Sequence, residues 1–285
     1  MSCKAVILAA GKGARLAPLT TAIPKELLPV FGLPAIHHVV YELAEAGISE
    51  IMIVLSQGKE GIGTYFSERS TPKGEIAERL SARKDALLSR VELRYAFQLE
   101  PRGTGDAILL AKDFADEEGL VVAYPDDLRR FDADVPQRRR EEPFFRSSER
   151  GFSSLLVRRV LGRNAGQYGV VFPRREEGKR PWFEVSRIEE KPVDYSADTA
   201  CVLFGRMRLT KDCLRAIEER PLSDREGVIP ALNAMAAKGK LRACLTQEET
   251  YDVGTHEGYA DTLRRLMRKQ RRKYERERTL SNMPS

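Results

Sequence analysis

Gly11, Gly13, Arg15 and Lys25 stand close together near the start of the chain, within the string LAAGKGARLAPLTTAIPKELLPV at residues 8–30. Gly11 and Gly13 follow an apolar run at residues 4–10, which is typical of a buried strand. Glycines at that point let the backbone turn tightly, so that its N–H groups can face an anion. Arg15 and Lys25 add positive charge to the same loop. This combination suits a triphosphate.

Two other kinds of phosphate loop are excluded. The dinucleotide fingerprint G-x-G-x-x-G would need a glycine where the chain has Leu16, and no GxxxxGK[ST] string is present. By themselves, the two glycines are equally compatible with a plain structural turn, and Arg15 and Lys25 with solvated surface charges. Only the whole string discriminates between these interpretations.

Two adjacent carboxylates form a second candidate group. Asp126 and Asp127 follow Pro125 at the end of a predicted buried strand over residues 120–124. In an open parallel sheet, side chains just beyond the carboxyl end of a strand point into the ligand crevice. The pattern favours a place for these carboxylates in a site, although such a pair also commonly caps a turn.

The elements that must position these residues begin with a βαβ unit. Apolar runs at 4–10 and 51–55 predict strands, and helical spacing at 35–46 predicts a helix between them, so the sheet is expected to be parallel here. Further helices are predicted within 60–90 and at 104–112, 211–220 and 226–238, where Pro230 falls at an interior position. Strands are predicted at 91–98, 120–124, 153–160, 168–172, 183–189, 200–207 and 241–245, an exposed helix or loop at 135–149, a turn at 251–254 and a final helix near 257.

The charge distribution separates a nearly neutral body from a basic end. The 285 residues carry 48 Lys and Arg against 42 Asp and Glu, a net charge of +6. Nine of these cations and two glutamates lie between Arg264 and Arg278, which gives that segment +7 and leaves −1 for the other 270 residues. The body has no basic, aromatic-interleaved surface of the nucleic-acid-binding kind. The end is interpreted as a docked helix that continues into solvent, with contact to an acidic patch of a neighbouring subunit as the alternative.

Composition also bears on the compartment. No run of about 18 uncharged apolar residues is present, which excludes a transmembrane helix, and the opening apolar run is too short for a signal peptide. The four cysteines contain no CxxC pair, which favours a reduced protein over a disulfide scaffold or a zinc site. We therefore expect a cytoplasmic protein that binds neither membrane nor nucleic acid.

The string at residues 8–30 resembles the nucleotide-binding signature of the sugar-1-phosphate nucleotidylyltransferases, LAAGxG[TS]RxxPxTxxxPKxLLPV. It departs at Ala14, where the family has Thr or Ser. The resemblance covers almost the whole chain and implies a Rossmann-like three-layer α/β fold with a mixed, mainly parallel central sheet, of the nucleotide-diphospho-sugar transferase type. We expect a catalytic domain at residues 1–262 and a basic C-terminal helix or tail at 263–285.

The resemblance also implies which residues bind substrates. Gln98 and RGTGDA at 102–107 resemble the base-recognition element, in which Gln offers a donor and an acceptor side by side. The expected nucleotide-binding residues are Ala10, Gly11, Gly13, Gln98 and Gly103. YGV at 168–170 and IEEKP at 188–192 resemble the sugar-binding pair. There Gly169 would leave room for the pyranose, Glu190 would accept hydrogen bonds from its hydroxyls, and Lys191 would hold its phosphate.

Metal and catalytic residues follow from the same resemblance. Asp126 is expected to bind Mg²⁺, with Asp127 as the near alternative because the spacing does not separate them. Asp252, in the string YDVGTHEGY at 251–259, would complete the metal site. The expected catalytic residues are Arg15, Lys25, Asp126 and Lys191.

Two features are similar to the bacterial UTP–glucose-1-phosphate uridylyltransferase branch: the long helical stretch from Ser56 to Phe97, and FGLPAIHHVV at 31–40. The reaction implied is uridylyl transfer from UTP to glucose 1-phosphate, giving UDP-glucose and pyrophosphate by Mg-assisted in-line displacement. Where that branch has a string of the type E-I-Q-L-T-D-A-I, this chain has EGVIPALNAM at 226–235. Sugar preference is therefore left open.

Two alternatives to this function remain. One is another pyrimidine nucleotidylyltransferase, acting with a thymidylyl group or on a different sugar 1-phosphate. The other is a catalytically inactive regulatory protein that binds nucleotide sugars, against which the joint retention of Lys25, Asp126, Lys191 and Asp252 argues. The expected partners are small-molecule substrates, and we expect a homo-oligomer.

Overall fold

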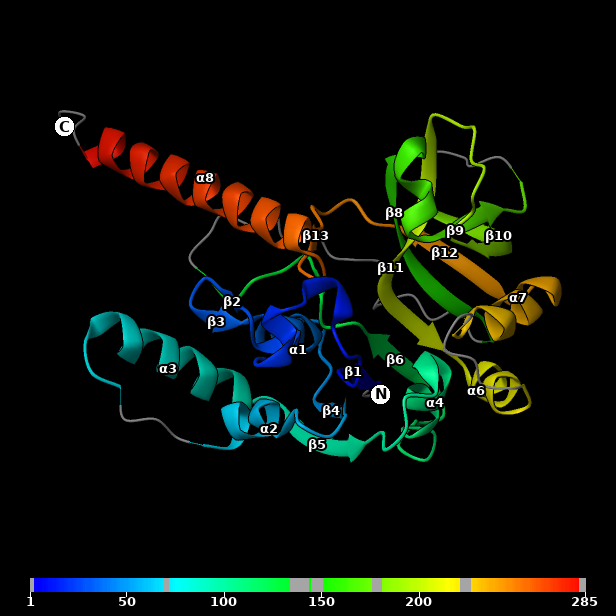
Figure 1. The fold of residues 1–285 in the computed structure, drawn as a ribbon, viewed down its shortest axis with the longest axis horizontal. Coiled ribbons are helices and arrows are strands. Elements are labelled where there is room, and N and C mark those ends of the chain that lie inside the picture. Colours follow the sequence, from blue (N-terminus) through cyan, green and yellow to red (C-terminus); the bar gives the residue numbers. More distant parts are fainter. Residues whose placement is uncertain are drawn as a thin grey trace.

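The computed structural model describes residues 3–68, 72–133, 144, 151–175, 181–220 and 227–281. Figure 1 shows strands flanked by helices, with one long helix extending away from the body. The strands are β1 (Lys4–Leu8), β2 (Pro29–Val30), β3 (Leu33–Pro34), β4 (Glu50–Leu55), β5 (Glu92–Phe97), β6 (Leu120–Ala123), β7 (Asp127–Leu128), β8 (Ser153–Leu161), β9 (Gly169–Pro173), β10 (Trp182–Glu190), β11 (Thr199–Leu209), β12 (Leu241–Leu245) and β13 (Tyr251–Asp252).

The helices are α1 (Ala35–Glu45), α2 (Glu60–Ser67), α3 (Glu75–Leu88), α4 (Gly103–Leu109), α6 (Lys211–Glu218), α7 (Ile229–Ala237) and α8 (His256–Ser281). Short 3-10 turns are η1 (Ala14–Leu16), η2 (Leu19–Thr21), η3 (Lys25–Leu27) and η4 (Gly162–Gln167). The strands and helices predicted from sequence are confirmed, with shifts of a few residues at their ends. The segment predicted at 135–149 lies outside the described residues apart from Phe144.

The central sheet has the strand order β5-β4-β1-β6-β11-β8-β12-β10-β9. Parallel pairing joins β5 to β4, β4 to β1, β1 to β6 and β12 to β8. In contrast, β11 pairs antiparallel with β6, β8 and β9, and β10 with β12 and β9. The mixed sheet is confirmed, but among the described strands it is not mainly parallel, because parallel pairing is concentrated in the first half. The strands β8 to β11 follow one another without an intervening α-helix in the described residues, which suits antiparallel pairing.

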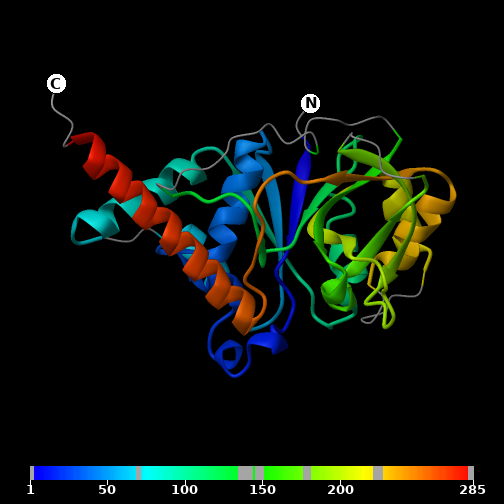
Figure 2. The ribbon, with the colours of Figure 1, turned by 90° about the horizontal axis from the view of Figure 1, so that it is seen from above.

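Helices cover both faces of this sheet, so the predicted three-layer architecture is confirmed. Along β1, Val6 and Leu8 face a core shared with α4, α6 and α7, whereas Ala5 and Ile7 face a core shared with α1, α2 and α3. In Figure 2, α1 lies on one side of β1 and α7 on the other. The carboxyl ends of β1, β4, β5 and β6 share one edge of the sheet because these strands are parallel.

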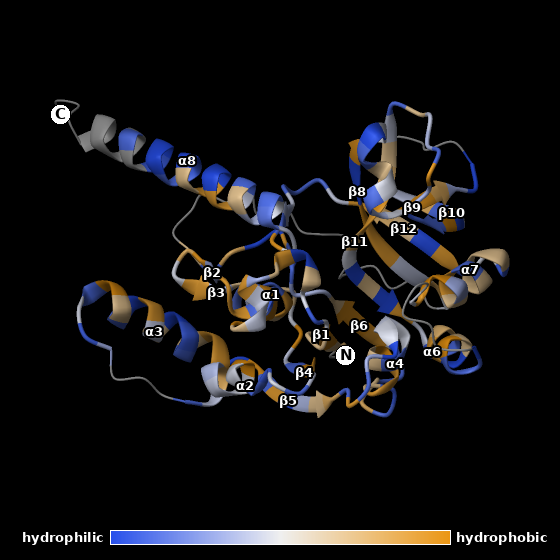
Figure 3. Ribbon diagram, viewed as in Figure 1, coloured by the Kyte–Doolittle hydropathy of each residue, from blue (hydrophilic) through white to orange (hydrophobic). Residues whose placement is uncertain are grey.

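The last helix crosses residue 262, the predicted domain boundary, without interruption. Leu266 in its first half is 2% exposed and packs in the core beside α1. Figure 3 shows that α8 is mainly hydrophilic, and Figure 1 shows its distal half leading away from the body. No helix among the described residues has the length and apolar character to span a bilayer.

The helix predicted at 226–238 begins later than expected. In the structure α7 starts at Ile229, so Pro230 lies in its first turn rather than its interior. Proline is tolerated there because the N–H groups of the first turn have no partner within the helix.

Candidate active site

Lys25, Arg15 and Asp126 come together beyond the carboxyl ends of β1 and β6. The Lys25 Nζ donates to Asp126 Oδ2 at 2.6 Å, and Arg15 Nη2 lies 3.6 Å from the same oxygen. The side chains of Lys25 and Asp126 are each 13% exposed, whereas that of Arg15 is 63% exposed. Burial opposes both charges, but attraction between the two ions outweighs it, so the pKa of Lys25 is raised and that of Asp126 is lowered. Two cations around one carboxylate leave a positive charge that suits a polyphosphate.

The glycine loop leaves β1 and passes beside Lys25. Gly13 has a φ of +69°, which favours glycine, and a Cβ there would lie 3.0 Å from Thr20 Cγ2 and 3.6 Å from Lys25 Cδ. Gly11 is different, because a Cβ at this position would meet nothing within 4 Å. Packing within the protein therefore explains Gly13 but not Gly11. The open space at Gly11 leaves room for a ligand to approach the backbone.

Lys59, which no sequence pattern marks, connects this loop to the segment that follows β4. Its Nζ donates to the carbonyl oxygens of Ala9 at 2.7 Å and Gly11 at 2.6 Å, and to both carboxylate oxygens of Glu26 at 2.9 and 2.8 Å. Lys59 is 7% exposed and Glu26 is 1% exposed. In a trans peptide the N–H points opposite to the C=O. The N–H groups of Ala10 and Lys12 therefore point away from Lys59, on the outer side of the loop.

The two aspartates after β6 face different neighbours. Asp127 Oδ2 accepts a hydrogen bond from the Gly205 N–H at 3.0 Å, and a Cβ at Gly205 would lie 2.6 Å from that oxygen. Burial, and then repulsion from Asp126, raise the pKa of Asp127 to about 6. Asp127 thus holds β7 against β11, while Asp126 is the carboxylate that meets Lys25 and Arg15.

The short strand β13 brings the late motif against Asp126. The Val253 N–H donates to the Asp126 carbonyl at 2.9 Å, and Asp252 lies opposite Asp127 in the β13–β7 pairing. Asp252 Oδ1 accepts a hydrogen bond from the Gly254 N–H at 2.7 Å. A Cβ at Gly254 would overlap Asp126 Oδ2, so only glycine permits this approach.

These carboxylates do not form a complete cation cage. Within the described ranges, no group of three or more Cys, His, Asp or Glu side chains is arranged to hold a metal ion. Asp126 and Asp252 still supply hard oxygen ligands from two neighbouring backbone segments. Such a pair fits Mg²⁺, which usually takes one or two carboxylates and completes its octahedron with water and substrate phosphates.

Gln98 and Gly103 meet at the end of β5. The Gln98 backbone N–H donates to the Leu55 carbonyl at 2.8 Å and extends the parallel ladder, and its side chain is buried. Gln98 Nε2 lies 3.0 Å from the Gly103 carbonyl oxygen and 2.9 Å from Asp106 Oδ2. Gly103 opens α4 with a φ of +85°, a conformation that favours glycine. Asp106 lies in the RGTGDA motif at 102–107, which by itself indicates no role for it.

Gly169, Glu190 and Lys191 meet where β9 begins and β10 ends. Gly169 lies opposite Glu190 in the pairing, and a Cβ on it would lie 3.1 Å from Glu190 Oε2. Lys191 has a φ of +46°, and its N–H donates to the Tyr168 carbonyl at 3.0 Å. Its Nζ lies 3.5 Å from Glu190 Oε1, and its side chain is 63% exposed. The turn therefore presents a carboxylate and an ammonium next to a glycine.

Tyr124 links this group to the aspartates. Burial raises the pKa of its phenol, a hydrogen bond with Thr104 opposes that shift, and the carboxylates of Asp126, Asp127 and Glu190 add to it. Glu190 is therefore within electrostatic reach of the same phenol as the two aspartates. The structure brings the predicted sugar-binding and phosphate-binding groups into one region.

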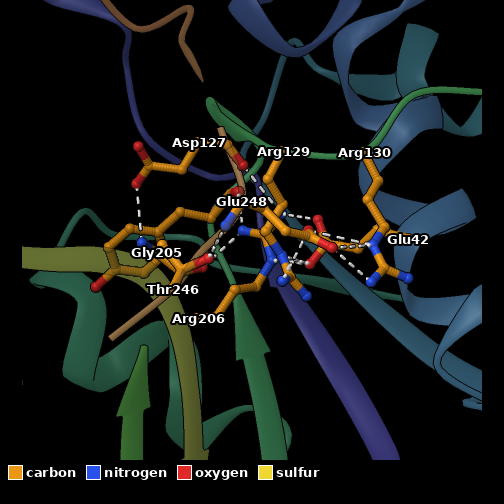
Figure 4. A network of polar contacts seen from close by, with 9 residues as sticks. Glu42, Asp127, Arg129, Arg130, Gly205, Arg206, Thr246 and Glu248 are labelled. Atoms are coloured by element: carbon orange, nitrogen blue, oxygen red, sulfur yellow. Dashed lines mark hydrogen bonds and ion pairs between the residues drawn. The ribbon is translucent and has the colours of Figure 1, made fainter. Parts of the chain in front are cut away.

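Arg206 lies behind the aspartate turn and is fully buried (Figure 4). Its Nη1 donates to the carbonyls of Tyr124 at 2.9 Å and Gly205 at 2.7 Å, and its Nη2 donates to the Asp127 carbonyl at 2.9 Å. Its Nε and Nη2 also donate to the two carboxylate oxygens of Glu42 at 3.0 and 2.8 Å. All five N–H donors of the guanidinium thus have acceptors. Two of these acceptors, on Tyr124 and Asp127, flank Asp126 along the chain.

The same network extends to the segment that precedes β13. Arg129 Nε donates to Glu42 Oε1 at 2.7 Å, and its Nη1 reaches Glu248 Oε2 at 3.2 Å. Arg130 Nη2 donates to Glu248 Oε1 at 2.7 Å. Burial opposes the ionisation of Glu42, but Arg129 and Arg206 outweigh it and hold the pKa of Glu42 at about 2. The network therefore connects α1, β11 and the two segments that carry the aspartates (Figure 4).

The sequence contained a partial signal for these supporting residues. Arg206 interrupts an otherwise mainly apolar strand, and Glu42 lies next to the apolar stripe of α1. A charge in such a position indicates a buried ion pair. Nothing local shows that the two are partners, because 164 positions separate them.

A profile of the nucleotidyl transferase family matches residues 4–269 of this chain. The UTP–glucose-1-phosphate uridylyltransferase of Bacillus subtilis (strain 168) is 30% identical over 268 residues, which cover 91% of this chain and 89% of that protein. A protein of the same name from Staphylococcus epidermidis (strain RP62A) is 30% identical over 269 residues, or 91% of this chain and 90% of its own length.

Solved structures are similar over the same extent. The UTP-bound UGPase from Acinetobacter baumannii superposes with a TM-score of 0.78 at 28% identity, covering 92% of each chain. A putative glucose-1-phosphate thymidylyltransferase from Bacillus anthracis superposes with a TM-score of 0.69 at 24% identity, covering 91% of this chain and 93% of that one. The second likeness concerns the fold alone.

We expect Glu42→Gln to lower the free energy of unfolding at pH 7 by about 3–5 kcal/mol, because it removes the carboxylate that Arg206 contacts and one of the two that Arg129 contacts. The folded pKa of about 2 lies below the ordinary value of 4.5, so the Glu42 carboxylate stabilises the fold above pH 4.5. That stability is lost as the pH falls toward 2. Urea unfolding between pH 7 and pH 3 should show this acid-dependent loss in the wild type and a weaker one in Glu42→Gln.

Glu45→Gln is the matched control for this variant. Glu45 lies on the same helix and pairs with Arg90 at 2.8 Å, with 25% and 46% of the two side chains exposed. Loss of this exposed ion pair should lower the free energy of unfolding by less than about 1 kcal/mol. Equal destabilisation by the two substitutions would contradict the role given to the buried network.

Proposed function

The chain belongs to the nucleotidyl transferase family, and we propose that it transfers a uridylyl group from UTP to glucose 1-phosphate and releases pyrophosphate. The observation that carries the proposal is the convergence of Lys25, Arg15 and Asp126 beside a glycine loop, at the carboxyl edge of the parallel strands. The identities of the nucleotide and the sugar are supported by relatives that are named for that reaction at 30% identity.

The proposed chemistry is a single in-line displacement. An oxygen of the sugar 1-phosphate attacks the α-phosphorus of UTP, a new P–O bond forms, and the bond to the bridging oxygen breaks as pyrophosphate leaves. The nucleophile is already an anion at neutral pH, so no general base is needed. The protein must hold two mutually repelling anions in line and stabilise the charge on the leaving group.

The residues of the site divide this task. In the proposal, the outward N–H groups of the glycine loop and the cations Lys25 and Arg15 hold the triphosphate. Gln98 and Gly103 contact the base. Glu190 hydrogen-bonds the sugar hydroxyls, and Lys191 holds the sugar phosphate. Asp126 keeps the Lys25 ammonium in place and protonated through their 2.6 Å contact.

Asp126 and Asp252 would hold Mg²⁺ in this proposal. When bound, the ion would neutralise charge on the phosphates as the pyrophosphate leaves. The chain prepares both carboxylates for that role, because Lys25 orients Asp126 and the Gly254 N–H orients Asp252. Asp127 is less suited, because its carboxylate faces Gly205 of β11, whereas that of Asp126 faces the Lys25 and Arg15 cations that would hold the phosphates.

A second candidate is the same transfer to a different sugar 1-phosphate. Residues 229–235 of the segment that departs from the uridylyltransferase branch form most of α7, which packs on β10. There the Asn233 side chain pairs with both the N–H and the C=O of Ile188, at 2.7 and 2.9 Å. Ile188 precedes Glu190 by two residues on the same strand, so an altered α7 can change the sugar side of the site.

A substrate panel tests the proposed function and separates it from the second candidate. The purified chain with Mg²⁺ is incubated with UTP, dTTP or CTP and with glucose 1-phosphate or other hexose 1-phosphates, and pyrophosphate release is measured. We expect the highest kcat/KM with UTP and glucose 1-phosphate. Preference for another sugar would support the second candidate. No turnover with any pair would overturn the proposal.

Lys25→Ala and Asp126→Ala are each expected to lower kcat/KM by about 100-fold or more, because each removes a charge that contacts the reacting phosphates or their metal. Circular dichroism should show an intact fold in both variants. Lys211→Ala is the control, since Lys211 makes an exposed ion pair with Glu117. Near-normal turnover in either site variant would contradict its assignment.

Lys59→Met is expected to weaken UTP binding by about 10-fold, because the carbonyls of Ala9 and Gly11 lose the donor that orients the loop. Lys84→Met is the matched control: Lys84 is also 7% exposed, and its Nζ donates to the carbonyls of Tyr65 at 2.9 Å and Glu68 at 2.6 Å, outside the site. Calorimetry with UTP measures both. Equal affinities of the two variants would show that Lys59 has a structural role only.

A further inference from the structure

We infer that Asp106 is a specificity-determining residue, which makes Gln98 a pure hydrogen-bond acceptor toward the base and so selects uracil or thymine over cytosine. This inference rests on the proposed function, because it concerns the nucleotide of that reaction. It assigns to Asp106 a role that the motif alone does not indicate. The sequence pattern alone leads us to expect that Gln98 offers the base both a donor and an acceptor. With Asp106 in place, only the acceptor is available.

The contacts of Gln98 determine which way its amide points. Both neighbours of Nε2 are groups that only accept: the Gly103 carbonyl oxygen at 3.0 Å and the Asp106 Oδ2 at 2.9 Å. A side-chain amide nitrogen has two N–H donors, and here each has an acceptor. The opposite orientation would place the amide oxygen against two other oxygens. The chemistry of the neighbours therefore fixes the orientation of the amide.

Burial makes this orientation costly to change. Gln98 is 8% exposed, and its backbone N–H is already used in the ladder with Leu55. If the amide were flipped in this buried site, it would lose two hydrogen bonds, and its oxygen would face two other oxygens. Among the contacts of the described residues, Gln98 Oε1 has no protein donor. This oxygen is the group that Gln98 has left to offer a ligand.

An acceptor at this point discriminates between pyrimidines. Uracil and thymine carry a hydrogen on N3, which can donate to Gln98 Oε1. Cytosine has a lone pair on N3, so the same contact would set two acceptors against each other and leave buried polar groups unpaired. The Gln98 Oε1 acceptor does not discriminate uracil from thymine, because both present the same N3–H.

The charge of Asp106 matters as well as its position. A carboxylate can only accept, so it enforces one amide orientation. An asparagine of the same shape could instead donate its NH₂ to Gln98 Oε1, which would let the amide turn its own NH₂ toward the base. The Gly103 carbonyl would still oppose that flip. The substitution should therefore weaken the discrimination without inverting it.

The test compares the wild type, Asp106→Asn and Glu100→Gln with UTP, dTTP and CTP at saturating sugar 1-phosphate. We expect the ratio of kcat/KM for UTP over CTP to fall by about 10-fold or more in Asp106→Asn. The ratio of UTP to dTTP should stay unchanged. Glu100→Gln removes the same charge nearby, where Glu100 makes an exposed ion pair with Arg102 at 2.6 Å, and should leave both ratios as in the wild type.

A merely structural role for Asp106 would lower activity with UTP and CTP alike, so an unchanged UTP-to-CTP ratio in Asp106→Asn overturns the inference. Calorimetry of the wild type without sugar phosphate provides a second measurement that needs no variant. It should show tighter binding of UTP and dTTP than of CTP, and equal affinities would also overturn the inference. Absence of turnover with every substrate pair would instead overturn the proposed function, while the same binding comparison carried out with Asp106→Asn would still test Asp106.

Discussion

The guanidinium of Arg206 lies at the point where the two halves of the sheet meet, and the geometry of the site depends on it. It bonds Glu42 of α1 on one side and the carbonyls of Tyr124 and Asp127 on the other, with every donor used. A buried charge is tolerated only when it is paired and hydrogen-bonded in this way. The backbone around Asp126 is thus held by an interaction that cannot shift without exposing unpaired charge.

Around this fixed turn, other residues hold the charged groups and the backbone of the site in position. Lys59 holds the inner carbonyls of the glycine loop, Asp126 holds Lys25, and the close approach of Gly254 brings the segment that carries Asp252 against Asp126. Lys59 and Asp126 follow the parallel strands β4 and β6 of the central sheet, whereas Gly254 follows β13 in the separate β13–β7 pair. In the proposed reaction, such preorganisation would place these charges before the substrates bind, and this is the source of electrostatic catalysis.

Sequence patterns predict the alternation of elements and mark the residues that we propose to face the substrates, but they do not show the groups that position them. The long motif at residues 8–30 marks Lys25, and the end of a predicted strand marks Asp126. Lys59 was missed because the lysine follows a strand in a polar segment, where periodicity does not show which way its side chain turns. Glu42 and Arg206 are partners across 164 positions, and no local pattern encodes such a pairing. The sequence pattern predicts Pro230 inside a helix because the start of α7 has no strong capping signal.

The central claim is that the edge formed by β1, β4, β5 and β6 binds a nucleoside triphosphate, and that Asp126 and Asp252 coordinate the Mg²⁺ that accompanies it. A crystal structure of the chain with Mg²⁺ and a non-hydrolysable UTP analogue tests it most directly. The account predicts the triphosphate along the N–H groups of residues 10–13, and Mg²⁺ within about 2.1 Å of carboxylate oxygens of both aspartates. A triphosphate bound elsewhere, or a metal held by Asp127 instead, would contradict it.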